Sequence, residues 1–115
     1  MTDCLFCKIA DKEIPATVVY ENEYVLAFND INPKAHQHVL VIPKKHIPAF
    51  EHLTEQDNKE IMPNLLTAIK EIAKQLGISE EGYRVVNNCG ENGGQTVGHI
   101  HFHLLGGRQL MWPPG

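Results

Sequence analysis

The sequence predicts a small α+β domain, with a five-stranded antiparallel sheet, one long helix and a short N-terminal helix. The chain has 115 residues, of which 43% are hydrophobic and 21% are charged, an ordinary balance for one globular domain over residues 1–115. Five short segments rich in β-branched and aromatic residues are separated by turn-forming residues. A single longer segment repeats its apolar residues with a helical period.

The strand segments follow one another along most of the chain. The stretch PATVVYENEYVLAFND at 15–30 predicts a hairpin that turns at Glu21–Asn22–Glu23. HVLVIP at 38–43 is mostly apolar and predicts a buried third strand. GYRVVNN at 82–88 predicts a fourth strand, and VGHIHFHLL at 97–105 predicts a fifth.

The segment 53–77 predicts the long helix. Thr54 is suited to cap its start and Gly77 to end it. Pro63 lies inside the pattern, which predicts either a kink at that residue or a helix that starts later. The residues expected on the buried face are Ile61, Leu65, Leu66, Ile69, Ile72, Ala73 and Leu76.

Charge, hydropathy and cysteine content narrow the classes of partner. The net charge of −4 argues against a nucleic-acid polymer, whose phosphates require a basic face. No apolar run is long enough for a membrane span, and the N-terminus has no secretory pattern. The odd number of cysteines, three, favours reduced thiols in a cytoplasmic protein.

Three histidines stand at every second position near the C-terminus. Side chains alternate along a strand, so His99, His101 and His103 are expected on one face, with the apolar residues between them pointing into the core. Their spacing of about 6.6 Å suits successive contacts along one extended substrate better than three bonds to one ion. Imidazole titrates near neutral pH, so such a row is suited to act as nucleophile, base or acid.

The loop GENGGQT at 90–96 comes just before the histidines. Its glycines allow close approach of an anion, and the amides of Gly93, Gly94, Gln95 and Thr96 are candidate phosphate-binding groups. Alone, such a loop is more often a plain turn. Next to a histidine row it points to phosphoryl or nucleotidyl transfer.

At this point the sequence resembles a known family. GGQTVGHIHFHLLGGRQLMWPPG at 93–115 looks like the signature of the histidine triad (HIT) family, and its ending is similar to the Hint branch, the adenosine phosphoramidases. The segment from CLFCKIADKE to VIPKKHI, residues 4–47, is similar to the family's N-terminal half. The resemblance implies a HIT-like fold over nearly the whole chain.

The resemblance also implies an activity, that of an adenosine 5′-monophosphoramidase. Such a hydrolase cleaves purine nucleoside phosphoramidates (AMP-NH-R, such as adenylated lysine or an aminoacyl-adenylate) to AMP and the amine. His101 would be the nucleophile that forms a covalent nucleotidyl-histidine, and His103 would contact the phosphate and the leaving group. His38 would orient the triad histidines and relay protons from behind them. His99 would lie before His101 along the same face of the strand. This chemistry requires no cofactor.

Two other functions remain open at this stage. One is a dinucleoside polyphosphate hydrolase of another branch of the family, and the other is a non-catalytic nucleotide-binding module that keeps the fold. A metal-dependent barrel hydrolase would need roughly 250 residues, far more than this chain has.

The family pattern also implies a nucleotide site. Asp30 matches the acidic residue that holds the ribose hydroxyls, and Asn88 matches the asparagine near ribose and phosphate. From sequence alone, a strand-end turn is a serious alternative explanation for Asp30, and plain core packing explains the apolar positions better than a purine pocket does. The residues expected to wall the purine are Phe6, Ile9, Ile14, Phe28, Ile31 and Leu40.

The pair Cys4 and Cys7 has the Cys-x-x-Cys spacing that lets two thiolates bind one zinc ion. Two buried structural cysteines and a redox pair are the alternatives. The resemblance implies a structural Zn²⁺ completed by His46 and His99, which competes with a relay role for His99.

The family resemblance implies a homodimer as well. Its expected interface consists of the long helix and the strand YRVVNN at 83–88, with Trp112 packed near the partner's active site.

Overall fold

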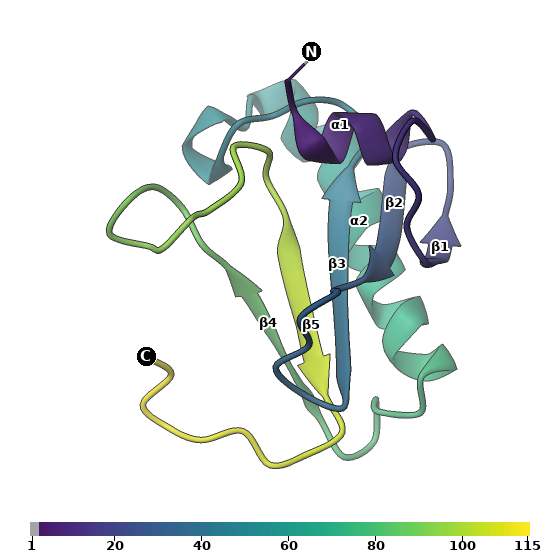
Figure 1. Cartoon of the computed structure of the whole chain (residues 1–115), viewed down its shortest axis with the longest axis vertical. Coiled ribbons are helices and arrows are strands. Elements are labelled where there is room, and N and C mark those ends of the chain that lie inside the picture. Colours follow the sequence, from purple (N-terminus) through teal and green to yellow (C-terminus); the bar gives the residue numbers. More distant parts are fainter. Residues whose placement is uncertain (1–2) are drawn as a thin grey trace.

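A computed structural model describes residues 3–115, which form one antiparallel sheet with helices on its two faces (Figure 1). The strand order is β1-β2-β3-β5-β4, so β1 and β4 are the edge strands. None of the helices in residues 3–115 has the length and hydropathy that crossing a membrane requires. The predicted α+β class, the long helix and the short N-terminal helix are confirmed. The elements are α1 Leu5–Ala10, β1 Val18–Glu21, β2 Val25–Asn29, β3 Gln37–Pro43, a 3-10 turn Phe50–His52, α2 Glu55–Gln75, β4 Tyr83–Asn87 and β5 Phe102–Gly106.

The sheet has a different helix on each face, and each face has its own apolar core. Val39 and Val41 of β3 point towards α2 and join the larger core, which also contains Phe102 and Leu104 of β5. Leu40, on the opposite face of β3, packs in a second core with the side chains of α1. Residues of the histidine row that alternate with Phe102 and Leu104 therefore lie on the α1 face.

Helix α2 starts at Glu55, well before Pro63, so the predicted alternative of a later start is wrong. Thr54 and Asp57 form a capping box that fixes the first turn. Gly77 ends the helix as predicted, with a φ of +74° that glycine adopts without strain. Leu66 was expected on the buried face, but it is 55% exposed, because it lies outside the stripe that contacts the sheet.

Strand β5 begins at Phe102, whereas the sequence predicted a strand from Val97. The residues before Phe102 bond to the last residue of β3 and to the segment after it instead of joining the ladder. The amide of Ile100 donates to the carbonyl of Ile47 over 2.7 Å, and the ring of His99 bonds to the carbonyl of Pro43. Thus only His103 of the histidine row lies in a strand, although the row still faces α1.

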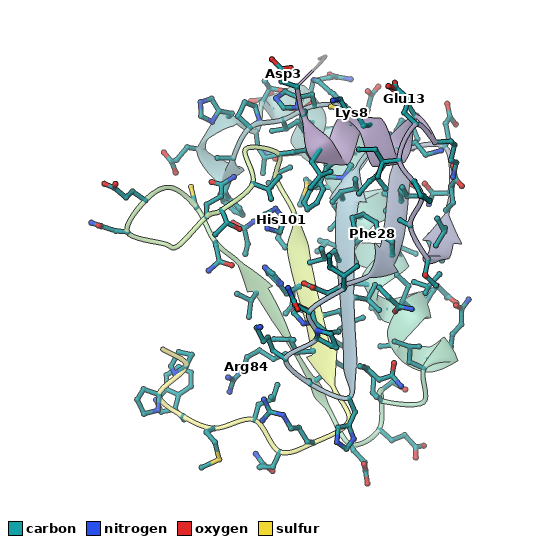
Figure 2. The ribbon with its side chains drawn as sticks, in the orientation of Figure 1. Asp3, Lys8, Glu13, Phe28, Arg84 and His101 are labelled. Carbon is teal, nitrogen blue, oxygen red and sulfur yellow. The ribbon has the colours of Figure 1, made fainter. Side chains whose placement is uncertain are left out.

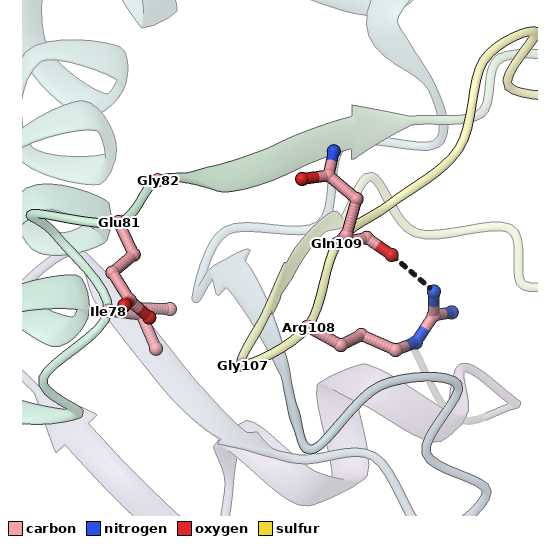
Figure 3. A pocket seen from close by; sticks show the side chains of 6 residues that line it. All are labelled: Ile78, Glu81, Gly82, Gly107, Arg108 and Gln109. Atoms are coloured by element: carbon pink, nitrogen blue, oxygen red, sulfur yellow. Dashed lines mark hydrogen bonds between the residues drawn. The ribbon is translucent and has the colours of Figure 1, made fainter.

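A cavity of about 410 Å³ lies at the turn that follows β5 (Figure 3). Its lining is Ile78, Glu81, Gly82, Gly107, Arg108 and Gln109, which includes none of the predicted site residues. The guanidinium of Arg108 donates to the carbonyl of Gln109 over 3.1 Å and to the carbonyl of Lys34 over 2.8 Å. Arg108 therefore fixes the loop that leads into β3.

Candidate functional site

His101 lies under α1, directly before β5, and is only 4% exposed (Figure 2). Its Nδ1 is 2.8 Å from the carbonyl oxygen of His99. A carbonyl can only accept, so Nδ1 carries the proton and Nε2 keeps its lone pair. The Phe6 ring packs edge-on against the imidazole at 5.1 Å, and Asn87 donates to the His101 carbonyl over 3.0 Å. His101 is thus held in the tautomer of a nitrogen nucleophile.

Sequence reasoning missed Asn87 and assigned a role only to its neighbour Asn88. The doublet Asn87–Asn88 at the end of β4 is the only signal that sequence offers for it. The side chain of Asn88 lines the cavity that contains His103, and it donates to the carbonyl of Gly93 over 2.7 Å.

His38 and His103 form a hydrogen-bonded pair whose tautomers are set from the backbone. The Lys34 amide donates to Nδ1 of His38 over 3.0 Å, so the neutral ring carries its proton on Nε2. That Nε2 lies 2.9 Å from Nδ1 of His103 and 3.4 Å from Oδ2 of Asp30. His38 therefore donates to His103, and His103 carries its own proton on Nε2.

The surroundings of this pair favour the neutral form of both rings. Burial lowers the pKa of His38, although the charge of Asp30 opposes the shift. Burial, with the neighbouring His101 and His38, lowers the pKa of His103 to about 4. His103 can thus present an N–H to a phosphoryl oxygen without carrying a charge of its own.

An apolar pocket of about 470 Å³ lies between α1 and β2. Phe28 forms part of it and contacts the ring of Phe6 edge-on at 5.5 Å. Ile31 is 94% exposed, which is unusual for a large apolar side chain and leaves it free to cover a ligand. The purine-wall residues predicted from the family all line this pocket, namely Phe6, Ile9, Ile14, Phe28, Ile31 and Leu40.

Asp30 lines the apolar pocket and also a second cavity of about 550 Å³ that contains His38 and His103. Its Oδ1 accepts from the amide of Asn32 over 2.7 Å, which fixes the carboxylate at the boundary between the two spaces. A ribose that joins a base in one space to a phosphate in the other would pass this carboxylate.

The glycine-rich loop is closed on itself. The amides of Gly94 and Gln95 donate to the carbonyls of Glu91 and Gly90. The Gln95 side chain accepts from the Gly90 amide and donates to two carbonyls, those of Pro48 and Val97. Thr96 lines a different cavity, beside Cys4 and His46. In this conformation these groups shape the loop, so their contact with phosphate stays a prediction.

Cys4, Cys7, His46 and His99 gather at the N-terminal end of α1, with ligand atoms all within 4.8 Å of one another. Nδ1 of His99 lies 3.3 Å from Sγ of Cys4 and 3.5 Å from Sγ of Cys7, and Nδ1 of His46 lies 3.3 Å from Sγ of Cys7. Burial and the neighbouring Cys4 raise the pKa of the Cys7 thiol to about 11.

The hydrogen bond on the outer nitrogen of His99 also fits a metal ligand. Nε2 of His99 lies 2.8 Å from the carbonyl of Pro43, so it carries the proton and leaves Nδ1 unprotonated towards the sulfurs. Two thiols and two imidazole nitrogens are a donor set typical of structural zinc. Both nitrogens of His99 are engaged in this way, which favours the ligand role over the relay role.

Comparison with known proteins finds a matching domain family and similar proteins of known structure. The HIT domain matches residues 11–110. A protein of Zea mays named "14 kDa zinc-binding protein" is 55% identical over 96% of this chain and 87% of its own length. The crystal structure of a HIT family hydrolase from Legionella pneumophila superposes with a TM-score of 0.95 at 55% identity, covering 98% of this chain and all of that one. A histidine triad protein from Clostridium difficile gives a TM-score of 0.92 at 48% identity, covering 96% of each chain.

Proposed function

The chain belongs to the HIT domain family, and from that premise we propose that it is an adenosine 5′-monophosphoramidase of the Hint type. It hydrolyses purine nucleoside phosphoramidates to AMP and a free amine through a nucleotidyl-His101 intermediate. The observation that carries the proposal is the bond from Nδ1 of His101 to the His99 carbonyl, since it leaves Nε2 with a free lone pair beside His103.

The reaction proceeds in two displacements. Nε2 of His101 bonds to phosphorus while the P–N bond to the amine breaks, and the leaving nitrogen takes up a proton from solvent. Water then attacks the phosphorus, the N–P bond to His101 breaks, and AMP leaves while the water proton passes to solvent. His103 donates its Nε2–H to the oxygen on which charge develops.

The nucleoside would lie in the apolar pocket, with the ribose hydroxyls on Asp30. Few polar groups line that pocket, so we expect a preference for purines with little discrimination between adenine and guanine. The zinc ion, when bound by Cys4, Cys7, His46 and His99, would fasten α1 to the sheet and would take no part in either displacement.

We further propose that the chain acts as a homodimer in the cytoplasm. A reducing compartment suits it because Cys4, Cys7 and Cys89 are free thiols. The dimer is supported by apolar side chains that stay exposed on β4, where Tyr83 is 36% and Val85 44% exposed.

The test of the activity is His101→Asn. This variant should bind AMP about as well as the wild type and should lose several orders of magnitude in turnover of an adenosine phosphoramidate, because the covalent route is gone. A nucleotidyl adduct should appear by mass spectrometry after an alkaline denaturing quench of the wild type only.

The matched control is His52→Asn, since His52 is an exposed histidine outside the site. It should keep both the turnover and the adduct. Near-normal hydrolysis by the His101→Asn protein would show that the nucleophile has been assigned wrongly.

A further inference from the structure

Helix α1 contributes residues to two sites at once. Cys4, its N-cap residue, and Cys7, in its first turn, belong to the four-residue cluster that fits zinc. Phe6 and Ile9 come from the same short helix and line the apolar pocket proposed for the purine. A metal ion held by the two thiols would therefore hold the same piece of backbone that carries one wall of the base pocket.

The ring of Phe6 connects the two sites. It lies edge-on to the ring of Phe28 in the apolar pocket, with centroids 5.5 Å apart, and edge-on to the imidazole of His101 at 5.1 Å. Figure 2 shows Phe28 and His101 on the side of α1 that faces the sheet. The same ring also contacts the imidazole of His99, a member of the cluster, at 6.0 Å. Since Phe6 is buried and interiors are closely packed, any movement of it changes the pocket.

Few polar contacts hold α1 against the sheet in the part of the chain that the structure describes. In residues 3–16, the polar contacts with the rest of the protein are those of the two thiols with His46 and His99 and one exposed ion pair, Lys12 with Glu21. Such an ion pair contributes little, and a helix of six residues is not stable alone. The position of α1 thus depends on apolar packing and on the cluster.

We propose that zinc in the cluster and a nucleotide in the apolar pocket bind cooperatively, each raising the affinity for the other through Phe6 on α1. This inference rests on the proposed function, which places the base in that pocket. Without the ion, α1 leaves the sheet for part of the time, and only the fraction with α1 in place is competent to bind the base. Coupling between two binding sites is reciprocal, so the nucleotide must raise the affinity for zinc by the same factor.

The nucleophile is held independently of α1. The amide of Ile100 donates to the carbonyl of Ile47 over 2.7 Å, and Nε2 of His99 donates to the carbonyl of Pro43 over 2.8 Å. These bonds fix the His99 carbonyl, which sets the tautomer of His101, and none of them involves α1. Loss of zinc should therefore raise the Kd for the nucleotide and the KM, while the maximal turnover stays nearly intact.

The experiment is a calorimetric titration with AMP of the zinc-loaded wild type and of the same protein after chelation and dialysis. The zinc-loaded form should bind AMP about tenfold more tightly, within the usual range of coupling between sites, and added zinc should restore that affinity. Competition with a chromophoric chelator should show that saturating AMP raises the affinity for zinc by the same factor. Adenosine, which has no phosphate to bind zinc in solution, should show the same coupling, because the base is the part that contacts α1.

Substitutions test the route of the coupling. In Phe6→Ala the ratio of the AMP affinities with and without zinc should fall towards one, while zinc still binds. The double variant Cys4→Ser with Cys7→Ser should bind AMP like the chelated wild type and should not respond to added zinc. Cys89→Ser, the control at a thiol outside the cluster, should keep the tenfold ratio. The comparison within the wild type requires no substitution, so it holds even where a variant does not fold.

Three results would overturn the inference. Equal AMP affinities with and without bound zinc would contradict the coupling alone and leave the zinc site and the proposed function in place. A tenfold ratio that persists in Phe6→Ala would contradict the role of Phe6. A protein that binds neither AMP nor adenosine in either form would lose the proposed function and the inference together.

Discussion

At the scale of single residues, the site is a set of identical rings given different tasks by their backbone partners. The His99 carbonyl fixes the tautomer of His101, the Pro43 carbonyl fixes that of His99, and the Lys34 amide fixes that of His38. Each choice decides which nitrogen is nucleophile, ligand or donor. Burial also lowers the pKa of His38, of His99 and of His103, which favours the neutral form of these three rings.

This neutrality predicts a pH dependence of stability. The pKa of His103 is about 4 in the folded chain against about 6.5 in an unfolded one, so the unfolded state binds more protons between these values. The free energy of unfolding should therefore fall as the pH decreases from 6.5 towards 4. His103→Asn should flatten this slope by up to about one proton in urea unfolding experiments across that range.

His52→Asn, the same substitution at an exposed position, serves as the control and should reproduce the wild-type slope. Identical slopes for His103→Asn and the wild type would mean that His103 is not a buried neutral ring.

Sequence predicted the identity of the site residues better than their bonds. The family motif pointed to His38, His101 and His103, which the structure brings into ring contact, with centroids 5.2 Å apart in the pairs His38–His103 and His101–His103. It could not point to the Pro43 carbonyl, which lies 56 positions from His99, or to the Lys34 amide, because any residue type supplies such backbone groups. Asn87 was missed because its target is also a backbone carbonyl.

At the scale of elements, helix α2 shows why local signals can compete. Pro63 removes one helical hydrogen bond and costs about 3 kcal/mol in a helix interior. The capping box at Thr54 and the buried stripe of α2 outweigh that cost, so the helix runs through Pro63. Strand β5 is the opposite case, because there tertiary contacts override a good local pattern. Bonds from His99 to Pro43 and from Ile100 to Ile47 keep these residues out of the ladder, so the strand begins only at Phe102.

The capping box itself can be tested. Asp57 is 2% exposed, its Oδ2 accepts from the Thr54 amide over 3.0 Å, and its Oδ1 accepts from Nζ of Lys45 over 2.6 Å. Asp57→Ala should lower the free energy of unfolding by about 2 kcal/mol in urea at pH 7, because a cap and a charge-assisted bond are lost together.

Lys45 and the Thr54 amide lower the pKa of Asp57, so this stabilisation is present above about pH 4 and is lost in stronger acid. Glu71→Ala, at an exposed position of the same helix, should change stability by less than about 0.5 kcal/mol. An Asp57→Ala protein as stable as that control would contradict the role of the box.

Helix α1 has only six residues and depends on its attachment to the sheet. With zinc bound by the four-residue cluster, chelation or the double change Cys4→Ser with Cys7→Ser should lower the melting temperature by at least roughly 5 °C. Metal analysis of protein purified without chelator should find one zinc per chain, and turnover should stay nearly intact after chelation.

Cys89→Ser is the matched control for this experiment, because Cys89 is a free thiol outside the cluster. It should retain the zinc and the melting temperature. An absence of stoichiometric zinc, or an unchanged melting temperature in the double variant, would remove the proposed metal site.

At the scale of the whole molecule, the sheet is covered unevenly. Helix α2 packs mainly on β1, β2 and β3, whereas β4 is the far edge strand of the sheet. Val85 pairs with Leu104, whose side chain belongs to the core beneath α2, so Val85 lies on the same face but remains exposed. An apolar edge strand with an uncovered face is a surface on which a second copy of the chain would gain stability.

The proposed homodimer should therefore be sensitive to charge at β4. Sedimentation equilibrium at micromolar concentration should give twice the mass of the chain for the wild type and a monomer for Val85→Glu, because each copy would bury a carboxylate without a partner. Val18→Glu is the matched control, since Val18 lies on the other edge strand and is 41% exposed against 44% for Val85. It should stay dimeric. A monomeric wild type would rule the dimer out, and a Val85→Glu protein that remains dimeric would move the interface away from β4.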